Sequence, residues 1–232
     1  MHPVQLSIVL MALLPVVAQR PFELRDYIRL DGSQLDLRGT SITDSDLAAA
    51  SGAEFSRVTT VLLAGTQVGD AGVVHLVRLP LRQLDLGRTQ ISDAALATLK
   101  GLGLERLELT STKVTDAGLV YLKGQPLSML TLRDTNLRGS ALSALEGMDL
   151  KVLDLSRTHI TDASIVALEK VKAIDTLDLS DTPVTDQAVG SLERIPRLSN
   201  VDLAGTAVTA AAVARLKQMR PQLTINTARA QR

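Results

Sequence analysis

The chain has 232 residues, of which 45% are apolar and 22% charged, a composition typical of a folded protein that buries a continuous core. Twenty-five Lys and Arg residues balance twenty-five Asp and Glu residues, so no net charge favours a nucleic-acid partner or an anionic membrane surface. Cysteine is absent, which excludes disulfides, thiolate catalysis and Cys-ligated metals.

Residues 1–18, MHPVQLSIVLMALLPVVA, contain no Asp, Glu, Lys or Arg and have the pattern of a secretory signal peptide. The apolar run from Ile8 to Leu14 is short for a transmembrane helix, so no integral membrane span is expected. The small residue Ala18 suits cleavage before Gln19. The prediction is an exported protein, periplasmic or secreted; the alternative is an N-terminal helix that caps a cytoplasmic protein. Residues 19–31 are expected to form a cap over the first unit of the domain.

A repeated unit occupies residues 32–222. Residues 81–103, LRQLDLGRTQISDAALATLKGLG, align with residues 104–126, LERLELTSTKVTDAGLVYLKGQP, and the consensus is LxxLxLxxTxITDxxLxxL. Its central threonine recurs in eight units, at Thr40, Thr66, Thr89, Thr112, Thr135, Thr158, Thr182 and Thr206. Periods of this length dictate a repeat architecture. Residues 223–232 are expected to close the stack with a ninth strand, Leu223 to Ile225, and a tail.

Each unit changes its hydrophobic period from that of a strand to that of a helix. Leu84 and Leu86 alternate with polar residues, as in a short strand with one buried face. The Ser-Asp or Thr-Asp pair that follows predicts a helix start, where the hydroxyl of Ser92, Thr115, Thr161 or Thr185 caps free N–H groups and the Asp favours the helix dipole. Apolar residues three apart then predict a helix of about eight to ten residues.

A strand and a short helix cannot bury their apolar faces alone, so consecutive units must stack with parallel strands about 4.8 Å apart. Eight strand–helix units also suggest a TIM barrel, but that fold needs about 250 residues and longer crossovers. Units of 23 or 24 residues therefore favour an open α/β solenoid.

In these motifs, residues 32–225 resemble the leucine-rich-repeat family, and within it the cysteine-containing type, whose units share the ITD helix start. Threonine stands here where that family has Cys or Asn. The resemblance implies a horseshoe with a parallel strand ladder on its concave face and short helices on its convex face. It also implies a protein partner bound on the concave strands. We expect the threonine hydroxyls to bond backbone groups of adjacent units.

No catalytic centre is predicted. His2 lies in the predicted signal segment, and His75 and His159 are about four units apart, so the histidines cannot share a proton or a metal ion. The glycines are dispersed at turns and do not form a phosphate-binding loop. Accordingly, no catalytic residue, metal or cofactor is expected.

The middle, outward position of the strands carries a column of acids, which Leu62 and Thr131 interrupt: Asp36, Asp85, Glu108, Asp154, Asp178 and Asp202. Stacked about 4.8 Å apart, these carboxylates repel one another unless they are paired, solvated or engaged by a basic partner. Arg38, Arg106 and Arg133 are expected to soften the repulsion, and Asp154 and Asp178 are expected to have no capping or packing role. A solvated ladder without a ligand is the alternative.

The predicted partner-binding residues surround this column on its C-terminal side: Arg106, Glu108, Met129, Thr131, Arg133, Val152, Asp154, Thr176, Asp178, Asn200 and Asp202. The prediction is a non-enzymatic protein-interaction module whose partner and oligomeric state stay open. Two alternatives remain: an envelope-associated structural repeat protein without a specific ligand, and a stoichiometric inhibitor or regulator of an enzyme.

Overall fold

Alternation of buried and outward side chains produces nine short strands that form one sheet. A computed structural model describes residues 23–29, 31–48 and 53–228. The strands are β1 Gln34–Asp36, β2 Thr60–Leu62, β3 Gln83–Asp85, β4 Arg106–Glu108, β5 Met129–Thr131, β6 Val152–Asp154, β7 Thr176–Asp178, β8 Asn200–Asp202 and β9 Thr224–Asn226. Each pairs in parallel with the next along the chain, so the sheet is open and the rejected barrel is absent.

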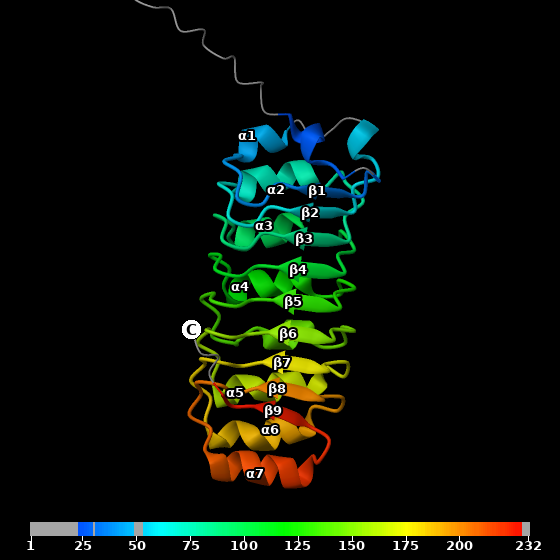
Figure 1. Ribbon diagram of the computed structural model, residues 1–232. Helices are drawn as coiled ribbons and strands as arrows, with labels where there is room; N and C mark the ends of the chain where they lie inside the picture. Colours follow the sequence, from blue (N-terminus) through cyan, green and yellow to red (C-terminus); the bar gives the residue numbers. More distant parts are fainter. Residues whose placement is uncertain (1–22, 30, 49–52, 229–232) are drawn as a thin grey trace, which may run out of the picture.

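The helices form a second layer behind the strands (Figure 1). They are α1 Asp44–Leu47, α2 Asp70–Leu76, α3 Asp93–Thr98, α4 Asp116–Leu119, η3 Val120–Leu122, η4 Leu142–Leu145, α5 Asp162–Ile165, η5 Val166–Lys170, η6 Asp186–Ala188, α6 Val189–Arg194 and α7 Ala210–Met219. In Figure 1 this layer extends beyond the strand ladder at both ends, which leaves the strands on the inner, concave face.

The expected helix length is wrong for most units. As an α-helix only α7, with ten residues, reaches it; α5 with η5 and η6 with α6 reach it as continuous runs of α and 3-10 turns, whereas η4 has four residues and α4 is extended only by the 3-10 turn η3. A 3-10 turn has three residues per turn and therefore spans the back of a short unit with fewer residues.

The core is a set of aliphatic columns that run through the whole stack. Leu84 and Leu86 are buried, as predicted, and Leu84 lies in register with Leu107 of the next strand. Because no unit encloses its own leucines, the stability of each depends on its neighbours.

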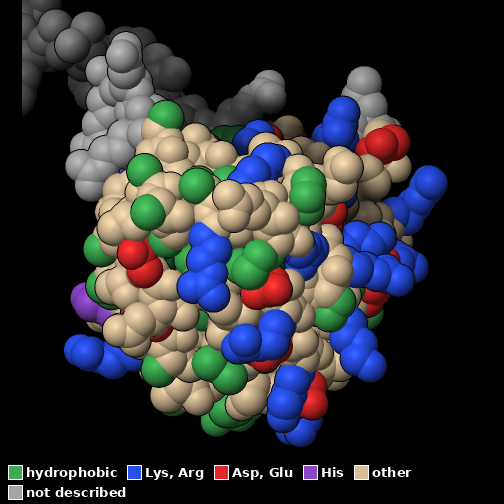
Figure 2. All heavy atoms as spheres, turned by 90° about the horizontal axis from the view of Figure 1, so that it is seen from below, with side chains coloured by type: hydrophobic (Ala, Val, Ile, Leu, Met, Phe, Trp, Pro, Cys, Tyr) green, Lys and Arg blue, Asp and Glu red, His purple; other side chains and the backbone are tan. Residues whose placement is uncertain are grey.

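Both ends of the stack are covered. At the start, η1 (Leu24–Tyr27) buries Leu24, and Ile28 forms an antiparallel bridge with Leu35 of β1. At the other end, the Arg220 guanidinium donates to the carbonyl oxygens of Glu193, Ile195 and Leu198 at 2.7–2.9 Å. Figure 2 views this end, where apolar side chains are scattered among basic, acidic and other polar groups.

The repeated threonines bond within their own units, so the expected bonds to adjacent units are wrong. Each hydroxyl donates to the carbonyl oxygen three residues earlier at 2.5–2.7 Å, as Thr112 Oγ1 does to Leu109 O. The physical reason lies in the residue before each threonine, which has a positive φ of 54–72° and folds the chain back: Gly39, Gly65, Arg88, Ser111, Asp134, Arg157, Asp181 and Gly205.

Aspartate makes the link between units that was expected of threonine. Asp93 Oδ1 accepts from the Thr115 N–H at 2.8 Å and Oδ2 from the Thr115 hydroxyl at 2.7 Å, in the next unit. The same pair of bonds joins Asp70 to Ser92, Asp162 to Thr185 and Asp186 to Thr209. The helix-start aspartates therefore hold neighbouring helix starts together, in addition to their expected effect on the helix dipole.

The hydroxyl caps are confirmed at three of the four predicted positions. Ser92, Thr115 and Thr185 each accept from the N–H two residues later at 3.3 Å. Thr161 makes no such bond, so the prediction is wrong there. Its unit follows the one that has Gly139 in place of the linking aspartate, and no carboxylate orients Thr161.

Candidate partner-binding face

All the predicted partner-binding residues lie on the strand face. One outward column runs from Arg106 through Met129, Val152 and Thr176 to Asn200, and each residue is in register with the next. The second outward column is Glu108, Thr131, Asp154, Asp178 and Asp202. Arg133 stands two residues beyond Thr131, just past the end of β5.

Three carboxylates of the second column are consecutive and lack a cation. Asp154 pairs in register with Asp178, and Asp178 with Asp202. In the part of the chain that the structure describes, no ion pair involves any of the three. All three side chains are half-buried. We call Asp154, Asp178 and Asp202 the acidic triad.

The expectation that Asp154 and Asp178 have no capping role is wrong. Asp154 Oδ1 accepts from the N–H of Ser156 at 2.8 Å and from its hydroxyl at 2.6 Å. Asp178 Oδ1 accepts from the Ser180 N–H at 2.8 Å, and Asp202 Oδ1 likewise from Ala204 N–H. A short acidic side chain that bonds the N–H two residues later stabilises the turn after the strand. One oxygen of each carboxylate is thus occupied by the fold itself.

Burial and the neighbouring carboxylates together raise the pKa of Asp178, the middle residue of the acidic triad. Partial burial raises the pKa of the Asp178 carboxyl, its hydrogen bonds with Ser180 lower it in part, and the carboxylates of Asp154 and Asp202 raise it further. Burial likewise raises the pKa of Asp85, farther along the same column. An opposite charge brought by a ligand would relieve this repulsion.

The three arginines that were expected to reduce the repulsion between the carboxylates make different contacts. Arg38 forms a bidentate pair with Asp36, at 2.9 and 2.6 Å, which lowers the pKa of that carboxyl through the hydrogen bonds. Arg133 Nη1 donates to the Ser156 hydroxyl at 2.7 Å instead of to a carboxylate. Arg106 is exposed, and no described residue forms an ion pair with it. An arginine therefore neutralises the carboxylate on the first strand, Asp36, but no cation pairs with the described carboxylates of the triad.

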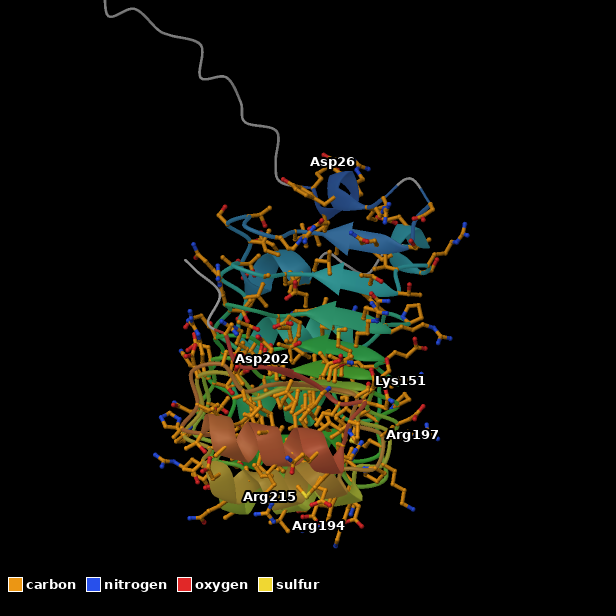
Figure 3. The ribbon with its side chains drawn as sticks, turned by 60° about the horizontal axis from the view of Figure 1, so that its bottom comes forward. Asp26, Lys151, Arg194, Arg197, Asp202 and Arg215 are labelled. Carbon is orange, nitrogen blue, oxygen red and sulfur yellow. The ribbon has the colours of Figure 1, made fainter. Side chains whose placement is uncertain are left out.

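In Figure 3, Asp202 lies among the strands, whereas Arg194 and Arg215 project from α6 and α7. At the C-terminal edge of the column, Asn226 Nδ2 donates to Asp202 Oδ2 at 2.7 Å. The triad is therefore bounded by Thr131 and Arg133 on one side and by this amide on the other.

His75 and His159 are apart, as expected, because His75 lies on α2 and His159 follows the threonine of a later unit; His2 lies outside the described residues. Within residues 23–29, 31–48 and 53–228, no group of three or more His, Asp or Glu side chains is arranged to hold a metal ion. Over the same residues, no helix has the length and hydrophobicity needed to cross a membrane.

The eight units, the open parallel sheet and its helical backing define a leucine-rich-repeat solenoid. The family model described as "Leucine Rich repeat" matches residues 104–123 and 148–168. The chain has the fold of a leucine-rich-repeat protein, and leucine-rich-repeat proteins are commonly protein-interaction modules. No curated protein matches the sequence. The likeness to the cysteine-containing type stays a prediction.

Three of the solved structures with similar folds come from two bacteria. An internalin, inlF, of Listeria monocytogenes is 17% identical with a TM-score of 0.66, and the match covers 86% of this chain and 55% of that one. Internalin C2 of the same organism is 22% identical with a TM-score of 0.65, over 85% of this chain and 80% of that one. A leucine-rich-repeat protein of Leptospira interrogans is 18% identical with a TM-score of 0.57, over 84% and 54%. These likenesses support the fold alone, and the chain spans little more than half of the first and third proteins.

Proposed function

We propose that this protein binds a protein partner on its strand face and that the acidic triad engages a basic segment of that partner. The observation that carries the proposal is the register of Asp154, Asp178 and Asp202, three half-buried carboxylates side by side without a cation. A lysine or arginine of a partner would supply the missing charge and lower the raised pKa of Asp178.

The remaining residues of the face suit a polar contact with moderate affinity. Met129 and Val152 offer apolar surface beside the triad, and the strands of the predicted face carry no Trp or Tyr to act as an anchor. Specificity would therefore come from charge placement, which also accelerates encounter at low salt.

The test removes the charges of Asp154 and Asp178 while keeping the hydrogen bonds that stabilise the turns after β6 and β7. In the double variant Asp154→Asn with Asp178→Asn, each amide oxygen can still accept the N–H of Ser156 or Ser180, whereas lysines would break both caps. Binding to an arginine-rich synthetic peptide is measured by fluorescence anisotropy at low and moderate salt. Proteins retained from a host extract are identified in parallel for wild type and variant.

The matched control, Glu54→Gln with Asp149→Asn, also removes two charges, from exposed residues outside the strand face. The proposal expects peptide binding and a defined set of host proteins to be lost only in the Asp154/Asp178 variant. Equal retention by both variants would contradict it and favour a structural repeat protein with a solvated acidic column. A stoichiometric complex that silences a host enzyme would identify the partner class as an enzyme.

We also propose that the protein is exported and that its mature chain begins at Gln19. The support is the uncharged apolar segment 1–18, which lies outside the described residues. Intact-mass measurement of the protein recovered from its host tests this. A cytoplasmic chain that retains residues 1–18 would refute export.

A further inference from the structure

The cover at the C-terminal end of the stack is incomplete. Arg220 covers carbonyl groups of the preceding turn, but no described unit lies beyond α7 and β9. Four apolar positions that are at most 4% exposed in the seventh unit are therefore only half-buried in the last unit. The pairs of equivalent positions are Val184 and Val208, Val189 and Val213, Ile195 and Met219, and Val201 and Ile225. This end consequently keeps apolar surface that the seventh unit buries against its successor.

The last strand, β9, also has a free edge. It pairs only with β8, and both Thr224 and Asn226 make backbone hydrogen bonds with that strand or its flanks. Backbone groups of successive residues in a strand point to opposite sides, so the N–H and C=O of Ile225 point away from β8. An open strand edge of this kind can be covered by another chain.

The C-terminal end is cationic. Residues 203–228 contain Arg215, Lys217 and Arg220 and no Asp or Glu. Arg215 is exposed on α7, and no described residue forms an ion pair with it or with Arg197 in the preceding turn. Figure 3 shows Arg215 and Arg197 at this end of the molecule. Positive charge thus accompanies the half-buried apolar side chains of the last unit.

The opposite end of the stack is acidic. Residues 23–48 contain six Asp and Glu but only three Arg and no Lys. Two of these arginines already pair with carboxylates of the same segment. Asp26 is exposed on η1 without an ion pair to any described residue, and Figure 3 shows it at the end opposite Arg215. Beside it, Tyr27 is 36% exposed and Ile28 is half-buried, so this end offers apolar surface as well.

We propose that the C-terminal end of one copy, formed by α7 and β9, binds the N-terminal end of a second copy, formed by η1 and β1, so that the copies associate head to tail. The contact places Arg215 and its basic neighbours against the acidic end that carries Asp26, and opposite charges across an interface favour association. It also removes Ile225, Met219 and the edge of β9 from water, which is favourable for the apolar side chains.

Charge selects this arrangement over the two symmetric ones. Two C-terminal ends would oppose Arg215 and Lys217 of one copy with the same residues of the other, and two N-terminal ends would oppose carboxylates. Like charges opposed across an interface are unfavourable. A contact between two different ends leaves one free end of each kind on every pair, so further copies can add in a chain or close into a ring.

The association does not rest on the proposed function. It uses the two ends of the stack, whereas the acidic triad lies on the strand face. Copies joined end to end would present several triads, which raises the apparent affinity for a partner with several basic segments. The variant Asp154→Asn with Asp178→Asn is expected to associate like wild type, so failure of one proposal does not decide the other.

Sedimentation velocity of the protein purified from its host, over a range of concentrations, tests the association. Wild type should form dimers and then larger species as its concentration rises. Arg215→Glu or Asp26→Arg alone is expected to raise the dissociation constant of the contact by about tenfold. Both changes in one chain exchange the charges across the contact and should restore association. These residues lie at opposite ends of the stack, so restoration can arise only between copies.

Lys113→Glu and Asp149→Arg are matched controls, because both residues are exposed in the middle of the stack. They reverse the same charges and should associate like wild type. A chain that is monomeric at all concentrations overturns the proposal, and so does equal weakening of association by the control variants. Circular dichroism confirms that each variant is folded.

Crosslinking identifies the two surfaces that meet. Lys217 is the only lysine after Lys172, so a crosslinked peptide that contains it marks the C-terminal end. A carbodiimide, which joins an amine to a carboxylate, is added to an equal mixture of isotope-labelled and unlabelled protein, and mass spectrometry selects crosslinks that contain one peptide of each kind. The proposal expects such crosslinks between Lys217 and the carboxylates of residues 23–31. Mixed crosslinks that join two C-terminal ends, or that exclude residues 23–31, overturn it.

Discussion

At the scale of single residues, the buried threonines act through hydrogen bonds inside their own turns. Thr112 is 8% exposed, and its hydroxyl donates to Leu109 O at 2.7 Å. Thr112→Val keeps the shape but leaves that carbonyl without its donor. We expect a loss of about 1 to 3 kcal/mol in the free energy of unfolding, measured in urea.

The control for this change is Thr98→Val on α3. Its hydroxyl donates to Ala94 O at 3.2 Å on an exposed surface, where water can replace it. That variant should lose little stability. Equal losses in the two variants would mean that the buried threonines only fill volume.

The middle carboxylate of the acidic triad should make stability depend on pH. Because burial raises the pKa of Asp178 above the ordinary 3.8, the folded state holds this proton more tightly than the unfolded chain. The resulting stabilisation is complete below the ordinary pKa and is lost as pH rises through the raised value. At neutral pH, Asp178→Asn removes the repulsion and keeps an oxygen for Ser180 N–H, so the variant should be more stable than wild type.

This gain should vanish in acid, below the ordinary pKa, where the wild-type carboxyl is also neutral. Urea unfolding of both proteins at neutral pH and in acid measures the difference. A variant that is less stable than wild type at neutral pH would show that the charged hydrogen bond with Ser180 outweighs repulsion and burial.

At the scale of secondary-structure elements, the helix starts are coupled by aspartates. The Asp93 carboxylate bridges α3 and the start of α4 through the N–H and the hydroxyl of Thr115. The same carboxylate explains why residue 118 is a glycine, because a Cβ atom at this position would lie 2.3 Å from Asp93 Oδ1. Carboxylate and glycine therefore form one packing unit between neighbouring repeats.

Asp93→Ala should lower the free energy of unfolding by about 1 to 3 kcal/mol, because hydrogen bonds with a charged group are lost and their donors are partly buried. Urea unfolding measures this effect. Asp149→Ala is the matched control, since Asp149 is exposed and no hydrogen bond with its side chain is observed in the described part of the chain. A comparable loss in the control would show that charge removal, and not the bridge, is responsible.

At the scale of the whole molecule, the junction between the fifth and sixth units lacks the aspartate bridge between helix starts. Gly139, with a φ of 87°, stands where the other six of the first seven units have the bridging aspartate, and a Cβ there would lie 2.4 Å from Ser164 Oγ. Near the helix starts, the Ser164 hydroxyl donates to Arg138 O at 2.9 Å and the His159 N–H donates to Leu137 O at 2.8 Å across this junction. The helical part of the fifth unit is only the 3-10 turn η4.

In a repeat array, stability is roughly a sum of units and of contacts between neighbours, so a weak junction opens first. Hydrogen exchange measured by mass spectrometry should be faster in a peptide covering residues 138–147 than in the equivalent peptides 92–101 and 115–124. Slower or equal exchange in the fifth unit would contradict the prediction that the junction between the fifth and sixth units opens first.

The sequence by itself determined the repeat, the strand centres and the face on which each residue lies. Leucines two apart can be buried only from one side of a strand, and a period of 23 or 24 residues permits only stacking. These properties follow from local spacing, so Leu84, Leu86 and the column from Glu108 to Asp202 were placed correctly.

Only the tertiary structure decided which partner each polar group takes. Thr112 bonds its own unit because the positive φ of Ser111 folds the chain back, whereas Asp93 reaches the next unit because stacking brings Thr115 beside it. Asp154 and Asp178 cap their own turns because the backbone bends immediately after the strands. Hydrogen bonds depend on positions within a few tenths of an ångström, which are set by backbone angles and neighbouring units and not by residue spacing.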